Sequence, residues 1–260
     1  NLVWNFMTDI YDPYFANGVA APFFEYALTS KWMDKEYLHL NRLWMAGDIV
    51  VGFVFTEAVV TSVFFNLRPG YEGLADEMVE YAQNSFPDLG GERELVIFSG
   101  QEALIRAAEK EGYKVSYENA DFLFDFRKSG LSYDLPEGFH FVDPFKCDLL
   151  KLAKCTWNGF NAEELGPFKN WNIPDSETPW NPHKAYTGVV NSAVAPPPHA
   201  THEYNVIIAD ENEDYVCFSG MWWVSENKLA YMEPLCTVPE YRKRGLAAAA
   251  LTQHYRRLKM

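Results

Sequence analysis

VPEYRKRGLAAAAL, residues 238–251, connects a strand pattern to a helix pattern near the end of the sequence. It follows an apolar run typical of a strand and leads into alanines typical of a helix. Gly245 permits close approach of the backbone to a ligand, and the N–H groups at a helix start bind anions. Because Arg242, Lys243 and Arg244 add positive charge, the stretch predicts a pyrophosphate site. An ordinary helix start with exposed basic side chains is the alternative.

A shorter copy of this stretch occurs in the first half of the chain. PGYEGLADEM (69–78) and PEYRKRGLAAAAL (239–251) share Pro, Tyr and Gly-Leu-Ala in the same order, and the first copy lacks the basic cluster. Each copy follows the third strand of an expected three-stranded meander. The repeat predicts two domains, residues 1–127 and 139–260, joined by a linker at 128–138 that contains Gly, Pro and Ser.

The first domain alternates legibly between strand and helix patterns. Apolar runs on both sides of Gly47-Asp48 predict a pair of antiparallel strands. The run TSVFFNLRPGYEGLADEMVEYAQNSF predicts a strand, a loop and a helix. We then expect a strand at 95–98, a helix from about Gln101 to Gly112, and an alternating strand pair ending near Phe126.

The second domain begins with FHFVD (139–143), which predicts a short strand. A helix opened by Pro144 is expected next, and residues 159–200 read as a long polar, proline-rich connection. Three strands with turns at ENED and SEN then lead into the last helix. The fold class predicted for the chain is α/β (α+β), with two mixed, mostly antiparallel sheets flanked by helices.

Composition restricts the partners. The net charge is -14, which argues against nucleic acid and anionic membranes. Four scattered cysteines without a CxxC pair favour reduced thiols in a cytoplasmic protein, and no metal site is expected, because HATH (199–202) lacks further ligands at metal spacing. No apolar run has the length of a membrane span, and no signal peptide is recognised. Because the chain starts at Asn1 rather than Met, the natural N-terminus is expected to be missing.

The motif resembles a known signature. Arg242, Gly245 and Ala247, placed after the strand end Val238-Pro239-Glu240-Tyr241, are similar to the acetyl-CoA-binding motif of the GNAT superfamily of N-acetyltransferases. The β-β-β-α order before the motif also resembles that fold, and the duplication resembles the tandem-domain members. The resemblance covers most of the chain and implies a degenerate first domain and a second domain that binds acetyl-CoA.

The resemblance also implies roles for particular residues. Backbone groups of Cys236, Thr237 and Val238 would pair with the pantetheine arm of acetyl-CoA as if it were an added strand. The first copy keeps Arg68 and Gly73-Leu74-Ala75 but is not expected to bind acetyl-CoA well. The pyrophosphate would be bound by the loop after the strand, which comprises Arg242, Lys243, Arg244, Gly245, Leu246, Ala247 and Ala248.

Transfer of an acetyl group to an amine requires a general base, because the amine arrives protonated. Glu233 is the carboxylate on the strand before the loop and is the candidate base, although Pro234 beside it can mark a bulge. A strand-edge carboxylate without catalytic duty is the alternative reading. The general acid of the family is expected beyond Met260, so the second domain is expected to be incomplete at its C-terminus.

The expected activity is acetylation of the primary amine of a small molecule by direct attack on the thioester. A non-catalytic acyl-CoA-binding or regulatory protein is the first alternative. An aminoacyl transferase that uses charged tRNA is the second, and the net charge of -14 argues against it. The sequence predicts neither the identity of the amine nor the oligomeric state.

Overall fold

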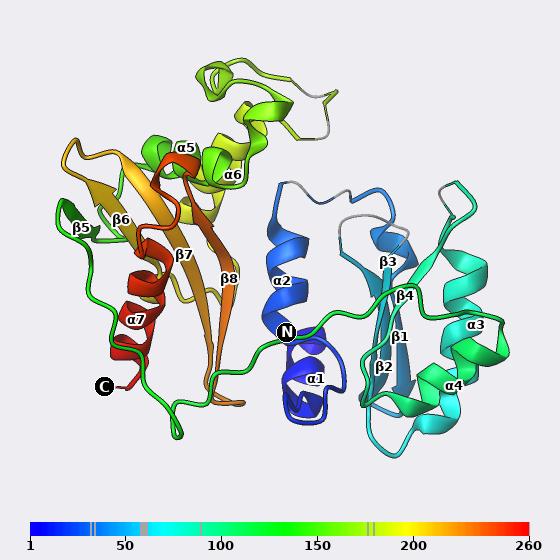
Figure 1. Cartoon of the computed structure of the whole chain (residues 1–260). Coiled ribbons are helices and arrows are strands. Elements are labelled where there is room, and N and C mark those ends of the chain that lie inside the picture. Colours follow the sequence, from blue (N-terminus) through cyan, green and yellow to red (C-terminus); the bar gives the residue numbers. More distant parts are fainter. Residues whose placement is uncertain are drawn as a thin grey trace. The chain divides into compact units, whose positions relative to one another are not determined.

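The computed structural model describes residues 1–31, 33, 35–57, 62–88, 90–175, 177–178 and 180–259. The chain forms two compact units, Asn1–Leu123 and Phe124–Met260, and each unit contains one four-stranded sheet (Figure 1). The predicted fold class, mixed sheets flanked by helices, is confirmed. None of the helices in these residues is both long and apolar enough to cross a membrane.

Unit 1 has a sheet in the order β1-β2-β3-β4, with β1, β2 and β3 antiparallel and β4 parallel to β3. The hairpin at Gly47-Asp48 and the strand, loop, helix, strand and helix after it are confirmed. The elements are α1 (Leu2–Ile10), α2 (Ala21–Thr29), η1 (Leu38–Leu40), β1 (Arg42–Ala46), β2 (Ile49–Thr56), β3 (Ser62–Leu67), η2 (Glu72–Leu74), α3 (Ala75–Ser85), β4 (Glu94–Val96) and α4 (Glu102–Lys110).

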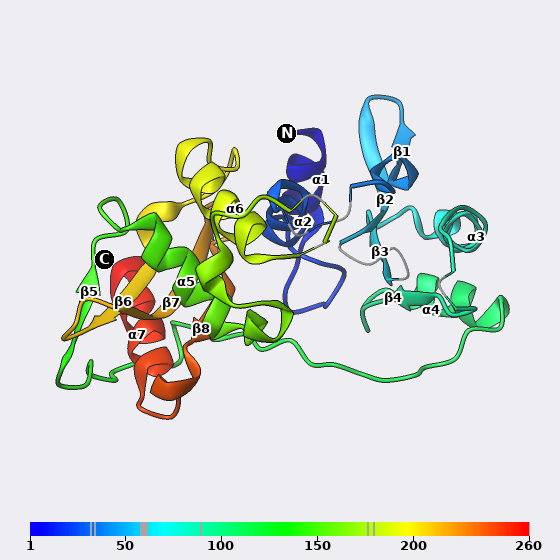
Figure 2. The same ribbon diagram turned by 90° about the horizontal axis from the view of Figure 1, so that it is seen from above.

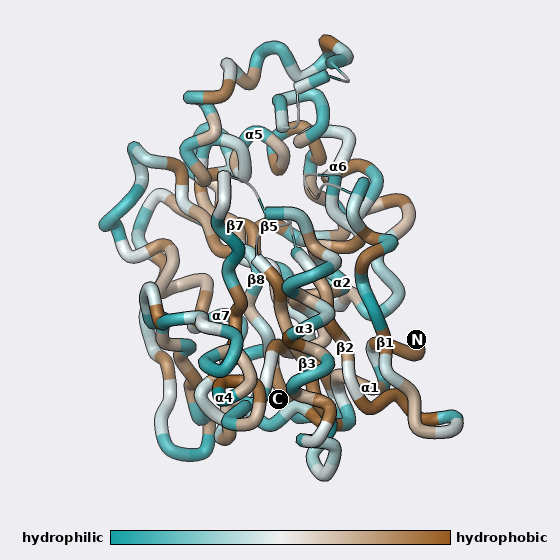
Figure 3. The backbone as a smooth tube through the Cα atoms, turned by 90° about the vertical axis from the view of Figure 1, so that its right-hand side faces the viewer, coloured by the Kyte–Doolittle hydropathy of each residue, from teal (hydrophilic) through white to brown (hydrophobic). Residues whose placement is uncertain are grey.

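Helices cover both faces of this sheet because β3 is apolar on both of its faces (Figure 1). Phe65 belongs to the buried cluster that includes Met78 of α3 and Leu104 of α4. On the other face, the rings of Phe23 in α2 and Phe64 lie 5.0 Å apart. Helix α1 is also largely apolar, as its brown colour in Figure 3 shows, and buries five of its residues.

The strand pair predicted to end near Phe126 is wrong. Residues 113–125 follow α4 as an irregular trace without helix or strand (Figures 1 and 2). The alternation of apolar and polar residues is present, but Val115 is 80% exposed and Phe122 is 98% exposed. A strand needs a hydrogen-bonding partner as well as a pattern, and the nearest strand in the sequence, β4, is only three residues long.

Unit 2 has the sheet order β5-β6-β7-β8, with all neighbouring strands antiparallel. Helix α5 packs on one face, where Cys155 contacts the cluster of Phe218 and Cys236, and α7 packs on the other face through Leu246 and Ala250. The elements are β5 (Phe139–Val142), α5 (Leu149–Gly159), η3 (Ala162–Leu165), η4 (Phe168–Asn170), α6 (Pro182–Val194), η5 (His202–Tyr204), β6 (Val206–Asp210), β7 (Tyr215–Val224), β8 (Leu229–Thr237), η6 (Pro239–Tyr241) and α7 (Leu246–Lys259).

Two predictions about the helices of unit 2 are corrected. Helix α5 begins at Leu149 rather than at Pro144, because the side chain of Asp148 accepts hydrogen bonds from the N–H groups of Leu150 and Lys151 and caps the helix there. The predicted connection 159–200 contains α6. This helix starts where the Asn181 side chain accepts a hydrogen bond from the backbone of Lys184.

The two units share part of their element order. In each unit two helices precede a three-stranded antiparallel meander, β1-β2-β3 or β6-β7-β8, and a helix follows it. When the copies are aligned on Pro69 and Pro239, Arg68 corresponds to Val238. The N–H of Arg68 donates to Val51 O at 2.8 Å, and the N–H of Val238 donates to Val216 O at 2.9 Å. The residue directly after β3 and the residue directly after β8 therefore make the same hydrogen bond to the neighbouring strand, β2 or β7.

The predicted linker packs along α7. The backbone N–H of Tyr133 donates to Thr252 Oγ1 at 3.1 Å, and an added Cβ at Gly130 would lie 3.0 Å from the Tyr255 hydroxyl. Phe126, which the sequence assigns to the first domain, also stacks edge-on against Tyr255. By contacts, the division between the units falls after Leu123.

Candidate acyl-CoA site

The loop between β8 and α7 reverses direction through two left-handed residues. Lys243 has φ +62° and Gly245 has φ +86°, and α7 begins at Leu246. A Cβ at Gly245 would meet only Pro136 Cγ, 3.9 Å away, so glycine is favoured here by its positive φ rather than by lack of space. The sequence signal at Gly245 therefore reflects backbone conformation.

The N-terminus of α7 offers a row of backbone donors. The first helical hydrogen bond runs from Ala249 N–H to Gly245 O at 2.9 Å, so the N–H groups of Leu246, Ala247 and Ala248 precede it. These donors and the positive end of the helix dipole form the surroundings that phosphate groups prefer. The buried side chain of Leu246 anchors this turn in the core.

Tyr241 fixes the loop to the sheet. Its hydroxyl donates to Asp210 Oδ2 at 2.7 Å, and Asp210 Oδ1 accepts the N–H groups of Asn212 and Asp214 in the turn between β6 and β7. The hydrogen bond to Asp210 raises the pKa of Tyr241, so the phenol stays protonated. The guanidinium of Arg244 lies 5.0 Å from the centre of the Tyr241 ring. The loop thus starts from a rigid point.

The side chain of Arg242 is exposed, like those of its two neighbours, but it is hydrogen-bonded to the protein rather than left free for a ligand. Its Nε donates to Thr237 O at 3.0 Å, and its Nη2 donates to Gly159 O at 2.9 Å and to Asn161 Oδ1 at 2.8 Å. Lys243 and Arg244 are exposed and carry the remaining positive charge of the loop. Among the three cations that the sequence brings together, Arg242 therefore has a bracing role.

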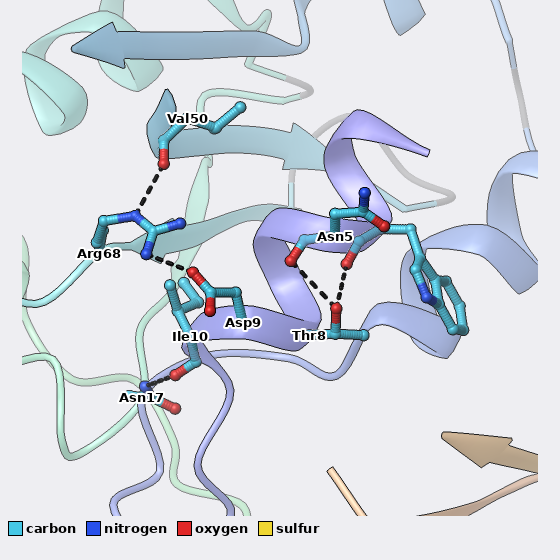
Figure 4. A network of polar contacts seen from close by, with 8 residues as sticks. Asn5, Thr8, Asp9, Ile10, Asn17, Val50 and Arg68 are labelled. Carbon is cyan, nitrogen blue, oxygen red and sulfur yellow. Dashed lines mark hydrogen bonds and ion pairs between the residues drawn. The ribbon is translucent and has the colours of Figure 1, made fainter. Parts of the chain in front are cut away.

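Unit 1 contains a comparable brace. Arg68, directly after β3, donates from Nε to Val50 O at 3.0 Å and forms an ion pair with Asp9 on α1 (Figure 4). In both units, an arginine that follows the last strand of the meander, β3 or β8, thus bonds to the first helix of that unit, α1 or α5.

The edge of β8 carries the backbone groups that an added strand would pair with. β8 is the last strand in its sheet within the described residues. The N–H of Val238 points toward β7, and because alternate residues of a strand point their backbone groups to opposite sides, Leu235 and Thr237 point to the outer edge. The sequence analysis named Cys236, Thr237 and Val238. Of these three, the register leaves only Thr237 at the outer edge, because the backbone groups of Cys236 and Val238 point toward β7. The register adds Leu235, which only knowledge of strand pairing could have identified.

Glu233 lies at the bulge that Pro234 indicates in the sequence. The pairing of β7 with β8 shifts between Ser219, which faces Leu235, and Met221, which faces Met232, so the bulge is confirmed. An added Cβ at Gly220 would lie 2.4 Å from Glu233 O, so the strands approach closely here. Burial raises the pKa of Glu233, and a hydrogen bond with Tyr231 opposes this shift in part. A carboxyl with a raised pKa suits a general base.

The cysteines near the β8 edge lack the properties of nucleophiles. Cys155, Cys217 and Cys236 are buried free thiols. Burial raises the pKa of Cys217 to about 11, whereas reactive cysteines have a lowered pKa. The hydrogen bond with Cys236, followed by burial, raises the pKa of Cys155. Nor do the described residues include a group of three or more His, Cys, Asp or Glu side chains that could hold a metal ion.

Comparisons with known proteins give a likeness among solved structures. No protein-family model matches the chain, and no curated protein matches it. A solved structure described as a GCN5-related N-acetyltransferase from Sphaerobacter thermophilus is similar, with a TM-score of 0.48 and 13% sequence identity. The match covers 83% of this chain and 67% of that chain. The chemistry of this protein is therefore inferred from its own residues.

Proposed function

We propose that the chain is an N-acetyltransferase of the GNAT superfamily that uses acetyl-CoA to acetylate the primary amine of a small molecule. The observation that carries the proposal is the loop after β8, in which the left-handed residues Lys243 and Gly245 lead to the free N–H groups of α7. This loop directly follows β8, which contains both the candidate base Glu233 and the outer-edge residue Leu235.

The residues present fit acetyl-CoA in three parts. The N–H groups of Leu246 to Ala248 would bind the pyrophosphate, and the exposed cations of Lys243 and Arg244 would offset its charge. The outward backbone groups of Leu235 and the outward N–H of Thr237 would pair with the amides of the pantetheine arm. Thr237 O already accepts a hydrogen bond from Arg242, so it is not counted among these groups.

When bound, acetyl-CoA would supply a thioester carbonyl that a free amine can attack. Glu233 would accept the proton that the incoming ammonium group has to lose, directly or through one water molecule. Its raised pKa keeps a carboxylate basic enough for this transfer. Because the pKa of Cys217 and Cys155 is also raised, an acyl-cysteine route is disfavoured and direct attack by the amine is the proposed mechanism.

Thiol release from acetyl-CoA, measured over a panel of small primary amines, tests the proposal. The parent chain should release thiol with at least one amine and bind acetyl-CoA in calorimetry. Binding without thiol release for any amine would identify a non-catalytic acyl-CoA-binding protein instead. The absence of binding would overturn the site itself.

A further inference from the structure

Strands β3 and β4 of unit 1 separate, and the chain fills the gap between them. The two strands pair over three positions, the last being Phe64 opposite Val96. Beyond this point the segment Ala16–Val19 bonds to both sides. Gly100 N–H donates to Ala16 O at 3.0 Å from the β4 side, and Asn66 Nδ2 donates to Val19 O at 3.2 Å from the β3 side.

Gln101 fastens this segment to the edge of β3. Its Nε2 donates to Phe65 O at 2.7 Å and to Asn17 O at 3.1 Å, and its Oε1 accepts the N–H of Phe98 at 2.9 Å. Gln101 is only 7% exposed, so water competes little for these groups. One amide side chain therefore joins the strand edge, the inserted segment and the turn after β4.

The position that Gln101 occupies corresponds to the proposed ligand edge of unit 2. Arg68 and Val238 make equivalent hydrogen bonds to the neighbouring strand, so Phe65 and Leu235, each three residues earlier, hold equivalent places. Phe65 O points to the outer edge, as the backbone groups of Leu235 do. In unit 1 this edge group already has a partner from the same chain.

The inserted segment fits without spare space. An added Cβ at Gly100 would lie 1.7 Å from Phe15 O, and one at Gly18, which has φ +134°, would lie 2.9 Å from Asn66 Nδ2. The side chain of Asn17 donates to Ile10 O at 2.6 Å (Figure 4). It also accepts the N–H of Asp12, and the two bonds fix the segment to the end of α1.

The helix start that follows β3 is also unsuited to an anion. The short helix η2 passes directly into α3, and Leu74 before α3 is right-handed, with φ -84°. Asp76 and Glu77 occupy the first turn of α3 and would repel phosphate. Closure of the edge and an acidic helix start are independent features of the same unit.

We propose that Gln101 and the segment Ala16–Val19 occupy the outer edge of β3, beyond its pairing with β4, and so keep unit 1 closed to acyl-CoA. The statement that unit 2 alone binds acyl-CoA rests on the proposed function. The closure of the β3 edge in unit 1 is independent of it. The occupant takes the place of a ligand strand and gives unit 1 a structural role.

Amide hydrogen exchange of the full chain tests the closure. Gly100→Ala places a methyl group on Phe15 O, whereas Gly73→Ala adds a methyl group into open space, and neither glycine has a positive φ. Gly100→Ala should speed exchange of the peptide containing Phe98 and Gly100 at least about tenfold, and Gly73→Ala should leave it unchanged. Gln101→Leu, which removes the three hydrogen bonds at similar size, should have the same effect as Gly100→Ala.

Exchange equal to the parent in both Gly100→Ala and Gln101→Leu would show that the segment does not close the edge. Saturating acetyl-CoA should slow exchange around 235–248 and leave the Phe98–Gly100 peptide unchanged. Slower exchange of that peptide, or two equivalents bound in calorimetry, would overturn the proposal. If acetyl-CoA binds nowhere, the proposed function fails, while the variant data still decide whether unit 1 is closed.

Discussion

Arg242 Nη2 donates a hydrogen bond to Asn161 Oδ1 at 2.8 Å. This bond joins the loop after β8 to the residues that follow α5. The same guanidinium satisfies Gly159 O, one of the last carbonyls of α5, which are left without intrahelical partners. A cation at a helix C-terminus also interacts favourably with the helix dipole. The most prominent arginine of the motif therefore positions the loop and does not need to contact phosphate.

Removing this brace should loosen the site without removing a phosphate contact. Arg242→Met and Asn161→Ala should each lower the melting temperature, and the double variant should show a coupling of about 1 kcal/mol, typical of one hydrogen bond. Arg242→Met should weaken acetyl-CoA binding while keeping the salt dependence of the parent. Lys243→Met, which deletes the neighbouring exposed charge, should reduce that salt dependence.

The double-mutant cycle and the salt series can contradict the bracing role independently. Additive changes in stability would show that Arg242 and Asn161 do not act together. A reduced salt dependence in Arg242→Met, equal to that of Lys243→Met, would show direct contact with phosphate.

Gly245→Glu should abolish acetyl-CoA binding. The substitution forces a side chain into a backbone position with φ +86° and adds a negative charge beside the proposed phosphate donors. Gly73→Glu is the matched control at the corresponding position of unit 1, where an added Cβ meets nothing within 4 Å. Calorimetry should give one site for the parent and for Gly73→Glu. Tight binding retained by Gly245→Glu would refute the assignment of the loop.

Local sequence patterns predict the two meanders and the loop well. Gly47-Asp48 is a turn signal, and Gly245 marks a backbone conformation, so each can be identified without knowledge of distant contacts. Helix α6 was missed because its stability comes from the Asn181 cap and from packing of Tyr186 on α5, while its apolar pattern is weak. These interactions depend on neighbours that the sequence does not place.

The sequence does not reveal how strands pair, and this limits the prediction of individual site residues. Leu235 cannot be distinguished from Cys236 as an edge residue until the register of β7 with β8 is known. The hydrogen bonding of Arg242 depends in the same way on Asn161, which is far away in sequence and has a left-handed φ of +59°. Residue type and spacing therefore predict where a site lies, and tertiary contacts decide which of its groups are available.

His254 should make stability depend on pH. It is buried on α7, with its Nε2 2.9 Å from Ser219 Oγ, and burial, followed by the charge of Arg257, lowers its pKa to about 4. Between its ordinary pKa of about 6.5 and about 4, the unfolded chain binds a proton that the folded chain does not. This contribution to the free energy of unfolding is therefore complete above about pH 6.5 and is lost as the pH falls.

Urea unfolding of the parent and of His254→Gln at several pH values measures this effect. The stability difference between the two proteins should change by about 3 kcal/mol in favour of the variant between pH 7 and pH 4. His39→Gln, which replaces an exposed histidine in the same way, is measured alongside as the control. A pH-independent difference for His254→Gln would mean that this imidazole does not titrate on unfolding.

Glu233→Gln should slow turnover by about 10²-fold or more and leave acetyl-CoA affinity nearly unchanged, because the amide keeps the shape but cannot accept a proton. Since burial raises the pKa of Glu233, the parent should lose activity on acidification at a higher pH than an ordinary carboxyl would cause, and the variant should lose that limb of the profile. Glu226→Gln, at an exposed carboxylate in the β7–β8 turn, is the matched control. Steady-state kinetics with a verified amine from about pH 4 to 9 provide the measurement. If Glu233→Gln stays within about threefold of the parent throughout, the base lies elsewhere in the chain.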